Sequence, residues 1–414
     1  MSVNVEKVAA LKSRMENNLR ECILPFWTNH MEDEENGGFY GAVRFDMTPV
    51  KTARKAIVLN TRMLWAFSRA YREYGDDVFK KLAKRGFEYI KDNFWDKKYG
   101  GVYWMLNYKG EPLEIEKRTY GQAFIIYSLA EYYRAFGDEE AKAMAMETFK
   151  KMNTAAKYEN GGYADSMTRD WQFDKNIWRW NMNPHGAAKL LNSHLHLFEA
   201  TLALYGATHD DYVLGVLKEF LEFLLDNAID YNVMHLKAGM DTETNRIDSE
   251  IDYGHDSECC YLLCQAADII EDPVLSSKTR DVVISIMSKV LEEGIDPTSG
   301  AINANTDFST GLTNRAKVWW TQCEGVTAFF NCYQLTEEEK YLDAAIGIWN
   351  YIEDKLVDNE NGEWHPVGMD EDVPGECINA MMAFFTGKAD SGKGPYHNSR
   401  TCFEIIERAE RLLK

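Results

Sequence analysis

Short motifs that contain glycine recur along this chain at intervals of about sixty residues. Six of them combine glycine with aromatic or small residues: Gly37-Gly38-Phe39-Tyr40, Gly100-Gly101-Val102-Tyr103-Trp104, Gly161-Gly162-Tyr163, Lys237-Ala238-Gly239, Ser299-Gly300-Ala301 and Asn361-Gly362-Glu363-Trp364. A period of this length fits two helices of a dozen or more residues with their connections. The sequence therefore predicts about six helical hairpins.

The stretches between these corners have apolar residues at helical spacing. One set follows the spacing of a single helical face: Leu64, Phe67, Ala70 and Tyr71. A second set follows it less strictly: Phe124, Tyr127, Leu129 and Tyr132. Alternating patterns typical of strands are scarce. The expected fold class is all-α.

Six hairpins that each carry one apolar stripe can bury every stripe by closing into a ring, with one set of helices inside and one outside. The predicted architecture is an (α/α)6 barrel, with the glycine corners around one central funnel, where backbone can approach a ligand closely. The widest gap between corners predicts an inserted loop over one rim, around residues 170–189. Any single glycine could merely end a helix, but the regular spacing favours the ring.

Length and charge restrict the function further. The chain has 414 residues and no linker-like or low-complexity tract, which predicts a single domain over residues 1–414. A net charge of -20 argues against nucleic-acid and anionic-membrane partners. The N-terminus lacks an apolar leader and no run is long enough to span a membrane, so we expect a cytoplasmic protein, a monomer or weak homodimer.

The eight cysteines are scattered over expected helices, and none forms a Cys-x-x-Cys pair with a matching second pair or histidine. They are expected to be reduced core residues, with no disulfide framework and no metal site.

Aromatic residues make up 13% of the chain and include eleven tryptophans. Aromatic faces stack on sugar rings while acidic and amide groups bind the hydroxyls, so a small neutral sugar is the favoured partner.

Three of the nine histidines lie in polar segments of different repeats, namely His196, His255 and His397. His194 points away from His196 on a helix, whereas Glu199 shares the face of His196. The other histidines are interpreted as packed or surface residues: His30, His185, His194, His209, His235 and His365.

Histidine suits the removal of a proton from a carbon next to a carbonyl near neutral pH. Two imidazoles on opposite faces of a planar intermediate permit inversion of that carbon. An enediolate intermediate also needs a cation or donor beside its oxygens. Arg62, among apolar residues in an expected helix, is one candidate; the alternative is a salt-bridged structural arginine.

Nine segments, in order along almost the whole chain, resemble the N-acylglucosamine 2-epimerase superfamily and within it the cellobiose 2-epimerases. They are Pro25-Phe26-Trp27, Glu35-Asn36-Gly37-Gly38-Phe39-Tyr40-Gly41, Thr61-Arg62-Met63-Leu64-Trp65, Tyr99-Gly100-Gly101-Val102-Tyr103-Trp104, Thr119-Tyr120, His194-Leu195-His196-Leu197-Phe198-Glu199-Ala200, Tyr253-Gly254-His255-Asp256-Ser257-Glu258, Val318-Trp319-Trp320-Thr321-Gln322-Cys323-Glu324 and Gly394-Pro395-Tyr396-His397-Asn398-Ser399-Arg400.

The resemblance implies an (α/α)6 barrel that inverts C2 of a reducing-end glucose or mannose unit, such as cellobiose to glucosyl-mannose, through a cis-enediol and without a cofactor. It implies that His255 and His397 are the acid/base pair, that His196 assists ring opening and that Arg62 steadies the enediolate. It also implies that the sugar site is lined by Tyr120, Asn192, Glu258, Trp319 and Trp320.

One position departs from the family pattern. Cellobiose 2-epimerases carry a tryptophan five residues before the last histidine, where it stacks on the outer sugar; here that residue is Gly392. A monosaccharide-specific mannose or glucose 2-epimerase is therefore an alternative, unless Trp364, Trp178 or Trp180 replaces the platform.

Three other readings stay open from the sequence. An aldose-ketose isomerase would use the same enediol and return the proton to C1. An inverting glycoside hydrolase would need two separated carboxyl groups, from the acidic residues Asp165, Asp256, Glu258 and Glu324. A non-catalytic sugar-binding protein would leave the three histidines unexplained.

Overall fold

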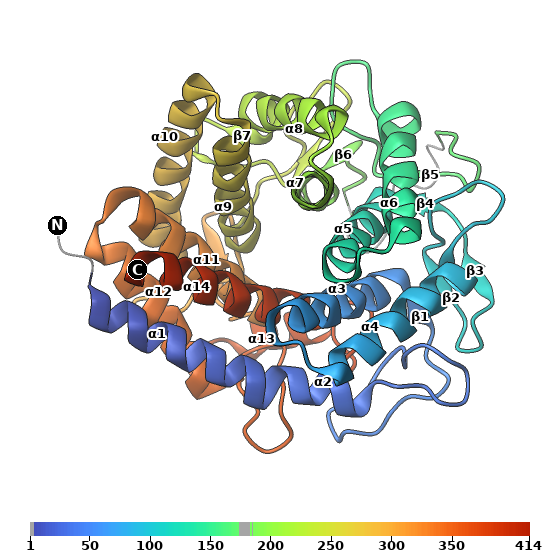
Figure 1. Cartoon of the computed structure of the whole chain (residues 1–414). Coiled ribbons are helices and arrows are strands. Elements are labelled where there is room, and N and C mark those ends of the chain that lie inside the picture. Colours follow the sequence, from blue (N-terminus) through green and yellow to red (C-terminus); the bar gives the residue numbers. More distant parts are fainter. Residues whose placement is uncertain (1–3, 174–182, 184) are drawn as a thin grey trace.

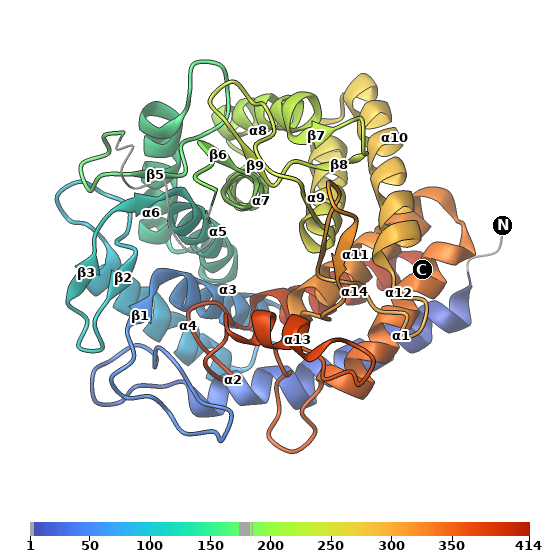
Figure 2. The ribbon, with the colours of Figure 1, turned by 180° about the vertical axis from the view of Figure 1, so that it is seen from behind.

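The protein is described by a computed structural model in which residues 4–173, 183 and 185–414 are placed. Helices form two concentric rings (Figure 1; Figure 2 shows the opposite face). The inner ring consists of six helices of 18 residues each: α3 (Ile57–Tyr74), α5 (Thr119–Phe136), α7 (Leu191–Thr208), α9 (Tyr253–Ile270), α11 (Trp319–Thr336) and α14 (Tyr396–Leu413).

The outer ring alternates with the inner ring along the chain. Its helices are α1 (Val5–Asn18), continued by α2 (Leu24–His30), then α4 (Asp77–Tyr89), α6 (Glu139–Lys151), α8 (Asp211–Phe223), α10 (Pro273–Lys289) and α12 (Glu339–Tyr351). The ring closes because α14 packs against α1, α11 and α3. The first and last helices of the chain therefore pair as the outer and inner helices of one repeat. The fold is the expected (α/α)6 barrel.

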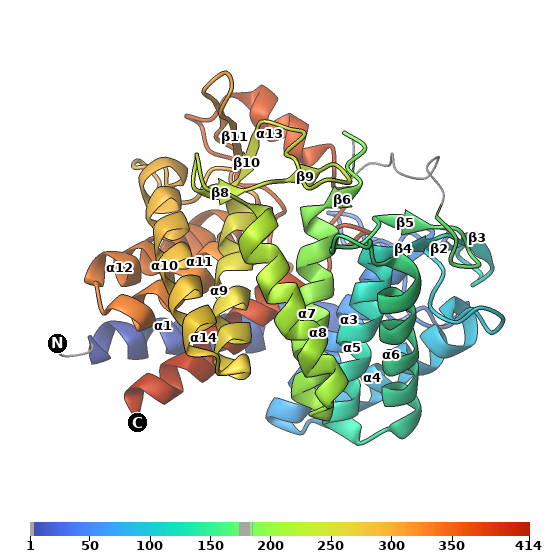
Figure 3. The same cartoon turned by 90° about the horizontal axis from the view of Figure 1, so that it is seen from above.

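The strands of the described residues are short and antiparallel, and they form five small sheets. They are β1 (Lys55–Ala56) with β2 (Met105–Leu106) and β3 (Pro112–Glu114), β10 (Glu250–Asp252) with β11 (Asn305–Asp307) and β12 (Leu312–Asn314), β4 (Lys117–Arg118) with β5 (Ser166–Met167), β6 (Lys189–Leu190) with β9 (Gly239–Met240), and β7 (Ile229–Asp230) with β8 (His235–Leu236). Figure 3 shows the strands together with α13 (Gly375–Met382) at the end of the barrel where the inner helices begin.

In the described part of the chain, one turn of π-helix follows α1, α4, α6, α8, α10 and α12. A tight corner comes directly after this turn in five repeats, and after α2 in the first. The corner brings two residues seven or six positions apart into antiparallel pairing: Glu32 with Phe39, Trp95 with Val102, Lys157 with Tyr163, Ile229 with Leu236, Ile295 with Ile302 and Val357 with Trp364. The fourth corner therefore lies at Met234 and His235, and the expected position at Lys237-Ala238-Gly239 is wrong. Met234 adopts φ 59° where the other corners use glycine, so no glycine marks this one.

The inner helices fasten these corners with polar side chains in their first turn. Gln122 bonds both the backbone N–H and the carbonyl of Val102, at 3.0 and 2.8 Å, and Gln322 does the same to Ile302, at 2.8 Å for both bonds. Buried lysines add ion pairs to the aspartate at the second position of four corners: Lys55 with Asp33 (2.8 Å), Lys117 with Asp96 (3.1 Å), Lys317 with Asp296 (3.0 Å) and Lys388 with Asp358 (2.6 Å). The repeat thus fixes where each inner helix begins.

The apolar core fills the space between the two rings. Trp364 is fully buried there, donates its Nε1–H to Asn18 Oδ1 at 3.0 Å and packs against Trp349, so it does not provide a sugar platform. Trp178 and Trp180 lie outside the described residues. All eight cysteines are free thiols and six are buried, as expected. In the described part of the chain, no helix has the length and apolarity of a membrane span.

Candidate active site

Every site residue expected from the sequence lies in the first two turns of an inner helix. Arg62 is on α3, Tyr120 on α5, Asn192 and His196 on α7, His255 and Glu258 on α9, Trp319 and Trp320 on α11, and His397 on α14. The six inner helices begin at the same end of the ring (Figure 3). The first turns that carry these residues therefore lie at that end. The last inner helix begins at Tyr396, which places His397 in its first turn.

The three candidate histidines share one arrangement: a carboxylate holds Nδ1 of each ring. His397 Nδ1 lies 2.5 Å from Glu324 Oε1, His255 Nδ1 2.9 Å from Asp252 Oδ2, and His196 Nδ1 3.2 Å from Glu199 Oε2. An ionised carboxylate accepts a hydrogen bond from Nδ1–H and so keeps that proton on Nδ1, which leaves Nε2 as the nitrogen that can exchange a proton with a ligand.

Aromatic contacts bring the three histidines together. The Trp320 ring contacts two of the imidazoles, with its centroid 5.0 Å from that of His255 and 5.6 Å from that of His397. His196 packs edge-on against Tyr120 at 4.9 Å and against Tyr396 at 6.0 Å, and Tyr396 contacts His397 at 4.6 Å. These ring contacts join three segments that lie far apart in the sequence.

The two imidazoles beside Trp320 have opposite protonation preferences. Burial lowers the pKa of His255, but the carboxylates of Asp252, Glu258 and Glu250 outweigh burial and raise that pKa to about 9. Burial lowers the pKa of His397 well below its usual value, and the nearby positive charge of Arg62 lowers it further. At neutral pH the site therefore holds one protonated and one neutral imidazole.

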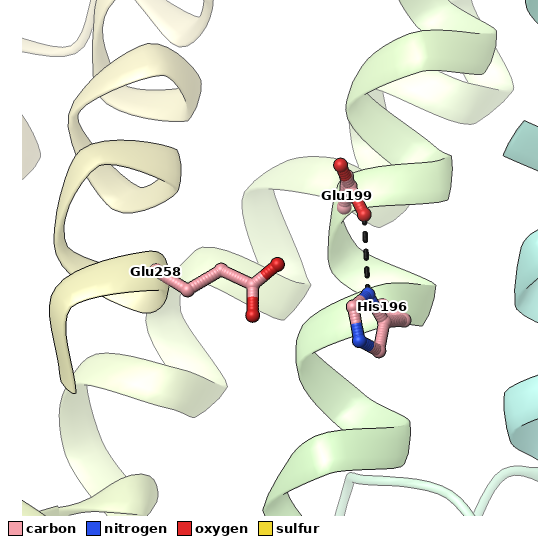
Figure 4. A group of neighbouring side chains, drawn as sticks. All are labelled: His196, Glu199 and Glu258. Atoms are coloured by element: carbon pink, nitrogen blue, oxygen red, sulfur yellow. Dashed lines mark hydrogen bonds and ion pairs between the residues drawn. The ribbon is translucent and has the colours of Figure 1, made fainter. Parts of the chain in front are cut away.

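Arg400, on α14, compensates the acidic side chains of the site. Its guanidinium is 4% exposed and pairs with Glu199, with Glu258 at 2.5 Å and with Glu324 at 2.6 Å. Figure 4 shows Glu258 reaching from α9 toward His196 and Glu199 on α7. One arginine thus joins α7, α9 and α11 to α14.

Two groups of side chains at this place have the spacing of metal ligands. In each, the ligand atoms lie within 4.8 Å of one another: His196, Glu199 and Glu258, and Glu258, Glu324 and His397. Arg400 already supplies positive charge to their three carboxylates.

Although burial opposes ionisation, Arg400 and His196 lower the pKa of Glu199 to about 2. Burial raises the pKa of Glu324, whereas Arg400 and the Tyr261 hydroxyl favour its ionised form.

Arg62 is 3% exposed and has no carboxylate partner among the described residues, so the salt-bridge alternative is wrong. Its Nη2–H donates to the Tyr120 hydroxyl at 2.9 Å and its Nη1–H to the Gly392 carbonyl at 2.9 Å. Nη2 also lies 3.4 Å from His397 Nε2. The guanidinium is therefore a buried cation beside the nitrogen that would handle the proton.

Several buried polar atoms at this place have no hydrogen-bond partner in the described part of the chain. They are Arg62 Nε, Asn192 Oδ1, Glu258 Oε2 and Trp319 Nε1. Buried polar groups are normally paired, so each such group calls for an explanation. A polyhydroxylated ligand would supply both donors and acceptors to them.

The remaining histidines take structural or peripheral places. His194 Nε2 accepts the Tyr163 N–H at 2.8 Å and its Nδ1–H donates to the Leu190 carbonyl at 2.8 Å, which fixes a neutral ring under the third corner. Burial lowers the pKa of His194 to about 4. His235 pairs with Asp256 at 2.6 Å in the fourth corner.

The sequence prediction placed Glu199 beside His196, but it missed Asp252 and Glu324 as partners of the other two histidines and Arg400 among the acids. Asp252 stands three residues before His255 and caps α9, and this spacing was a signal that could have found it. Glu258, expected to line the sugar site, pairs with Arg400. Glu324 and Arg400 belong to segments that resemble the family. No pattern in the neighbouring sequence indicates that Glu324 contacts His397 or that Arg400 contacts Glu199.

Comparisons with known proteins agree with this geometry. The model of the N-acylglucosamine 2-epimerase (GlcNAc 2-epimerase) family matches residues 38–380. The cellobiose 2-epimerase of Ruminococcus albus is 35% identical over 397 residues, which cover 96% of this chain and 98% of that protein. The structure of cellobiose 2-epimerase from Bacillus thermoamylovorans superposes with a TM-score of 0.87 at 30% identity, over 97% of this chain and 100% of the other.

A more distant relative is the D-mannose isomerase of Marinomonas mediterranea, 21% identical over 392 residues that cover 90% of this chain and 92% of that protein. The family match covers most of the chain, and the cellobiose 2-epimerase likeness extends over nearly all of it. The protein belongs to the N-acylglucosamine 2-epimerase family and is a carbohydrate epimerase similar to the cellobiose 2-epimerases.

Proposed function

We propose that this protein inverts C2 of the reducing-end glucose unit of cellobiose to give glucosyl-mannose, and catalyses the reverse reaction. The observation that carries the proposal is the pair of imidazoles that both contact the Trp320 ring, one protonated and one neutral. Inversion through a planar intermediate needs this combination, since one group takes the proton and another delivers one. Likeness to cellobiose 2-epimerases over nearly the whole chain supports the choice of sugar.

The residues have the following roles in this proposal. His196 assists opening of the sugar ring, which exposes the C1 aldehyde. His397 Nε2 removes the C2 proton of the epimer whose hydrogen faces it, and the electrons of the C–H bond form the C1–C2 double bond of an enediolate. Arg62, 3.4 Å from His397 Nε2, stabilises the negative oxygen. His255 then delivers its proton to the opposite face of C2.

The first experiment is proton NMR in heavy water with cellobiose and, separately, with mannose. Entry of deuterium at C2 together with the C2 epimer of cellobiose would support the proposal. Activity on mannose alone would favour the monosaccharide enzyme that Gly392 suggests, and formation of ketose would favour an aldose-ketose isomerase. Absence of C2 exchange with both sugars would overturn the enediolate mechanism.

The pH dependence of kcat/KM should reflect both histidines. We expect activity to fall as pH rises through about 9, because His255 then loses the proton that it must deliver. Activity should also fall at acidic pH, well below the usual histidine pKa, where His397 becomes protonated. Steady-state rates across the stability range of the protein measure both limbs, which belong to the coupled pair.

The Asp252→Asn variant isolates the carboxylate that supports His255. Asparagine can still cap α9, because its side-chain oxygen can accept the hydrogen bonds that Asp252 accepts at 3.0 Å from the backbone N–H groups of Gly254 and His255. The fold should therefore be retained. Loss of the negative charge should move the alkaline limb down by about one to two pH units, since a hydrogen bond to a charged group contributes about 1.5–3 kcal/mol. An unmoved limb would show that His255 does not control it.

Gly392 bears on the size of the substrate. It is exposed, and a Cβ added there would meet only Asp390 Oδ1 at 3.5 Å, so a larger side chain fits. We expect Gly392→Trp to lower KM for cellobiose by roughly three- to tenfold through stacking on the outer sugar, with little effect on mannose. Gly392→Leu is the control for apolar bulk without an aromatic face. Equal changes for both sugars would contradict an outer-sugar contact.

The hydrolase alternative has little support in the structure, because its candidate carboxylates are already engaged. Asp256 binds His235 and the Leu236 N–H, and Glu258 and Glu324 pair with Arg400. Asp165 accepts from Ser193 Oγ at 2.6 Å and from Asn183 Nδ2 at 3.1 Å. Release of glucose from cellobiose would reveal hydrolysis.

A further inference from the structure

The sixth corner contains a buried glutamate in a backbone conformation that disfavours it. Glu363 takes the position that Gly38, Gly101 and Gly162 take in the first three corners, with φ 59° and no exposed surface. A non-glycine residue in this left-handed region costs on the order of 1–3 kcal/mol. Such strain persists only where other contacts hold the residue in place, and it often marks a functional region.

Three donors hold the carboxylate of Glu363. Oε1 accepts from Lys393 Nζ at 2.5 Å and from Asn398 Nδ2 at 2.8 Å, and Oε2 accepts from Trp27 Nε1 at 2.7 Å. The side chains of Lys393 and Glu363 are both completely buried. Replacing either charge alone would leave the other unpaired in the core.

This ion pair lies outside the fastening pattern of the repeat. In the sixth corner, Lys388 already pairs with Asp358 at 2.6 Å and donates to the Gly362 carbonyl at 2.7 Å, as Lys55 does with Asp33 and Gly37 in the first corner. The corner is therefore secured without Glu363. A second buried pair at the same place calls for another role.

Two of the three donors to Glu363, Lys393 and Asn398, lie on either side of His397 in the sequence. The residue before Lys393, Gly392, offers its carbonyl to Arg62 at 2.9 Å, and Asn398 follows His397 directly. The Lys393 ammonium also lies 4.6 Å from the centroid of the Trp319 ring, which packs edge-on against His397 at 5.4 Å. The ion pair thus contacts Trp319 directly, and it contacts the chain next to the residue that binds Arg62 and next to His397.

We propose that Glu363 and Lys393 are positioning residues for epimerisation: their ion pair fixes residues 392–398 so that Arg62 and His397 address the same C2–C1 edge of the sugar. The inference rests on the proposed epimerase function. Neither residue touches the sugar; both act through the Gly392 carbonyl, the Trp319 ring and the first turn of α14. A shift of about 1 Å in such a support can lower turnover about 100-fold.

The test compares two double variants that each remove one buried ion pair without leaving an unpaired charge. The first is Glu363→Gln with Lys393→Met. The matched control is Asp33→Asn with Lys55→Met, which removes a pair of similar burial and length that fastens the first corner. Melting temperature, kcat per folded protein, KM and the rate of C2 deuterium exchange are measured for both, and Lys393→Arg serves as the charge-conserving variant.

For the first double variant we expect kcat and C2 exchange to fall together by at least about tenfold, with KM changed by less than about threefold, because a transition-state contact is misaligned. The control should keep kcat per folded protein while its melting temperature falls. Lys393→Arg should retain more activity than the first double variant. Unchanged kcat in the first double variant, or an equal loss in both, would overturn the positioning role. Absence of C2 exchange in the natural protein would instead overturn the proposed function, and this inference with it.

Discussion

The His397→Asn variant is expected to epimerise its sugar about 100- to 10,000-fold more slowly than the natural protein, the usual range for loss of a general acid or base. Its affinity for the sugar should stay within a few fold, because binding relies on groups from all six inner helices. The variant should also keep one partial reaction. The epimer whose C2 hydrogen faces His255 can still exchange that hydrogen with solvent, since His255 remains in place.

Proton NMR in heavy water, started separately from each epimer, measures this asymmetry. Exchange from the one reactive epimer should increase as pH approaches about 9, because His255 must be neutral to accept a proton. His209→Asn is the control; His209 ends α7 in the left-handed conformation, φ 50°, which asparagine also adopts. Equal exchange from both epimers, or from neither, would contradict a mechanism with one histidine on each face.

Replacement of Arg400 by methionine is expected to destabilise the fold by about 3–5 kcal/mol and to abolish activity. The guanidinium is the shared partner of three buried carboxylates, Glu199, Glu258 and Glu324. Removal of one partner of a buried ion pair leaves uncompensated charge and has this typical cost. Two of these carboxylates also hold His196 and His397, so both rings should lose their orientation.

Thermal unfolding should show a melting temperature lower by roughly 3–6 °C for a chain of this length. Adding Glu324→Gln to Arg400→Met should restore part of the stability, because one of the unpaired charges is removed. Arg411→Met is the control on the same helix: its side chain is 67% exposed, and its pair with Glu407 should contribute only about 0.3–0.5 kcal/mol. A melting temperature unchanged by Arg400→Met would contradict the role of Arg400 as the charge that joins the inner helices.

Much of the architecture could be predicted because it repeats. Gly37, Gly100, Gly161, Gly300 and Gly362 all adopt positive φ in corners, so a local backbone requirement recurs at regular intervals in the sequence. The fourth corner could not be found in this way, since Met234 takes the same conformation without being glycine. There the surrounding β7–β8 pairing holds a residue that local preference disfavours.

The histidines illustrate the same division within the site. Glu199 and Asp252 lie three residues from His196 and His255, a distance at which helical and capping geometry brings side chains together. Glu324 is 73 residues from His397 and meets it only because α11 and α14 are neighbours in the ring. The sequence could indicate the first two partners, and no local pattern could indicate the third.

The sequence by itself determined the sixfold helical repeat, the helix starts that carry His196, His255 and His397, and the family to which these motifs belong. Those features depend on periodicity, capping and glycine conformation, which act between residues close in the chain. Only the tertiary structure decided which histidine is protonated, how Arg400 compensates three acids and why Glu363 is tolerated in a glycine position. These properties depend on charges from distant helices that meet at the axis, where burial strengthens each interaction and penalises each unpaired group.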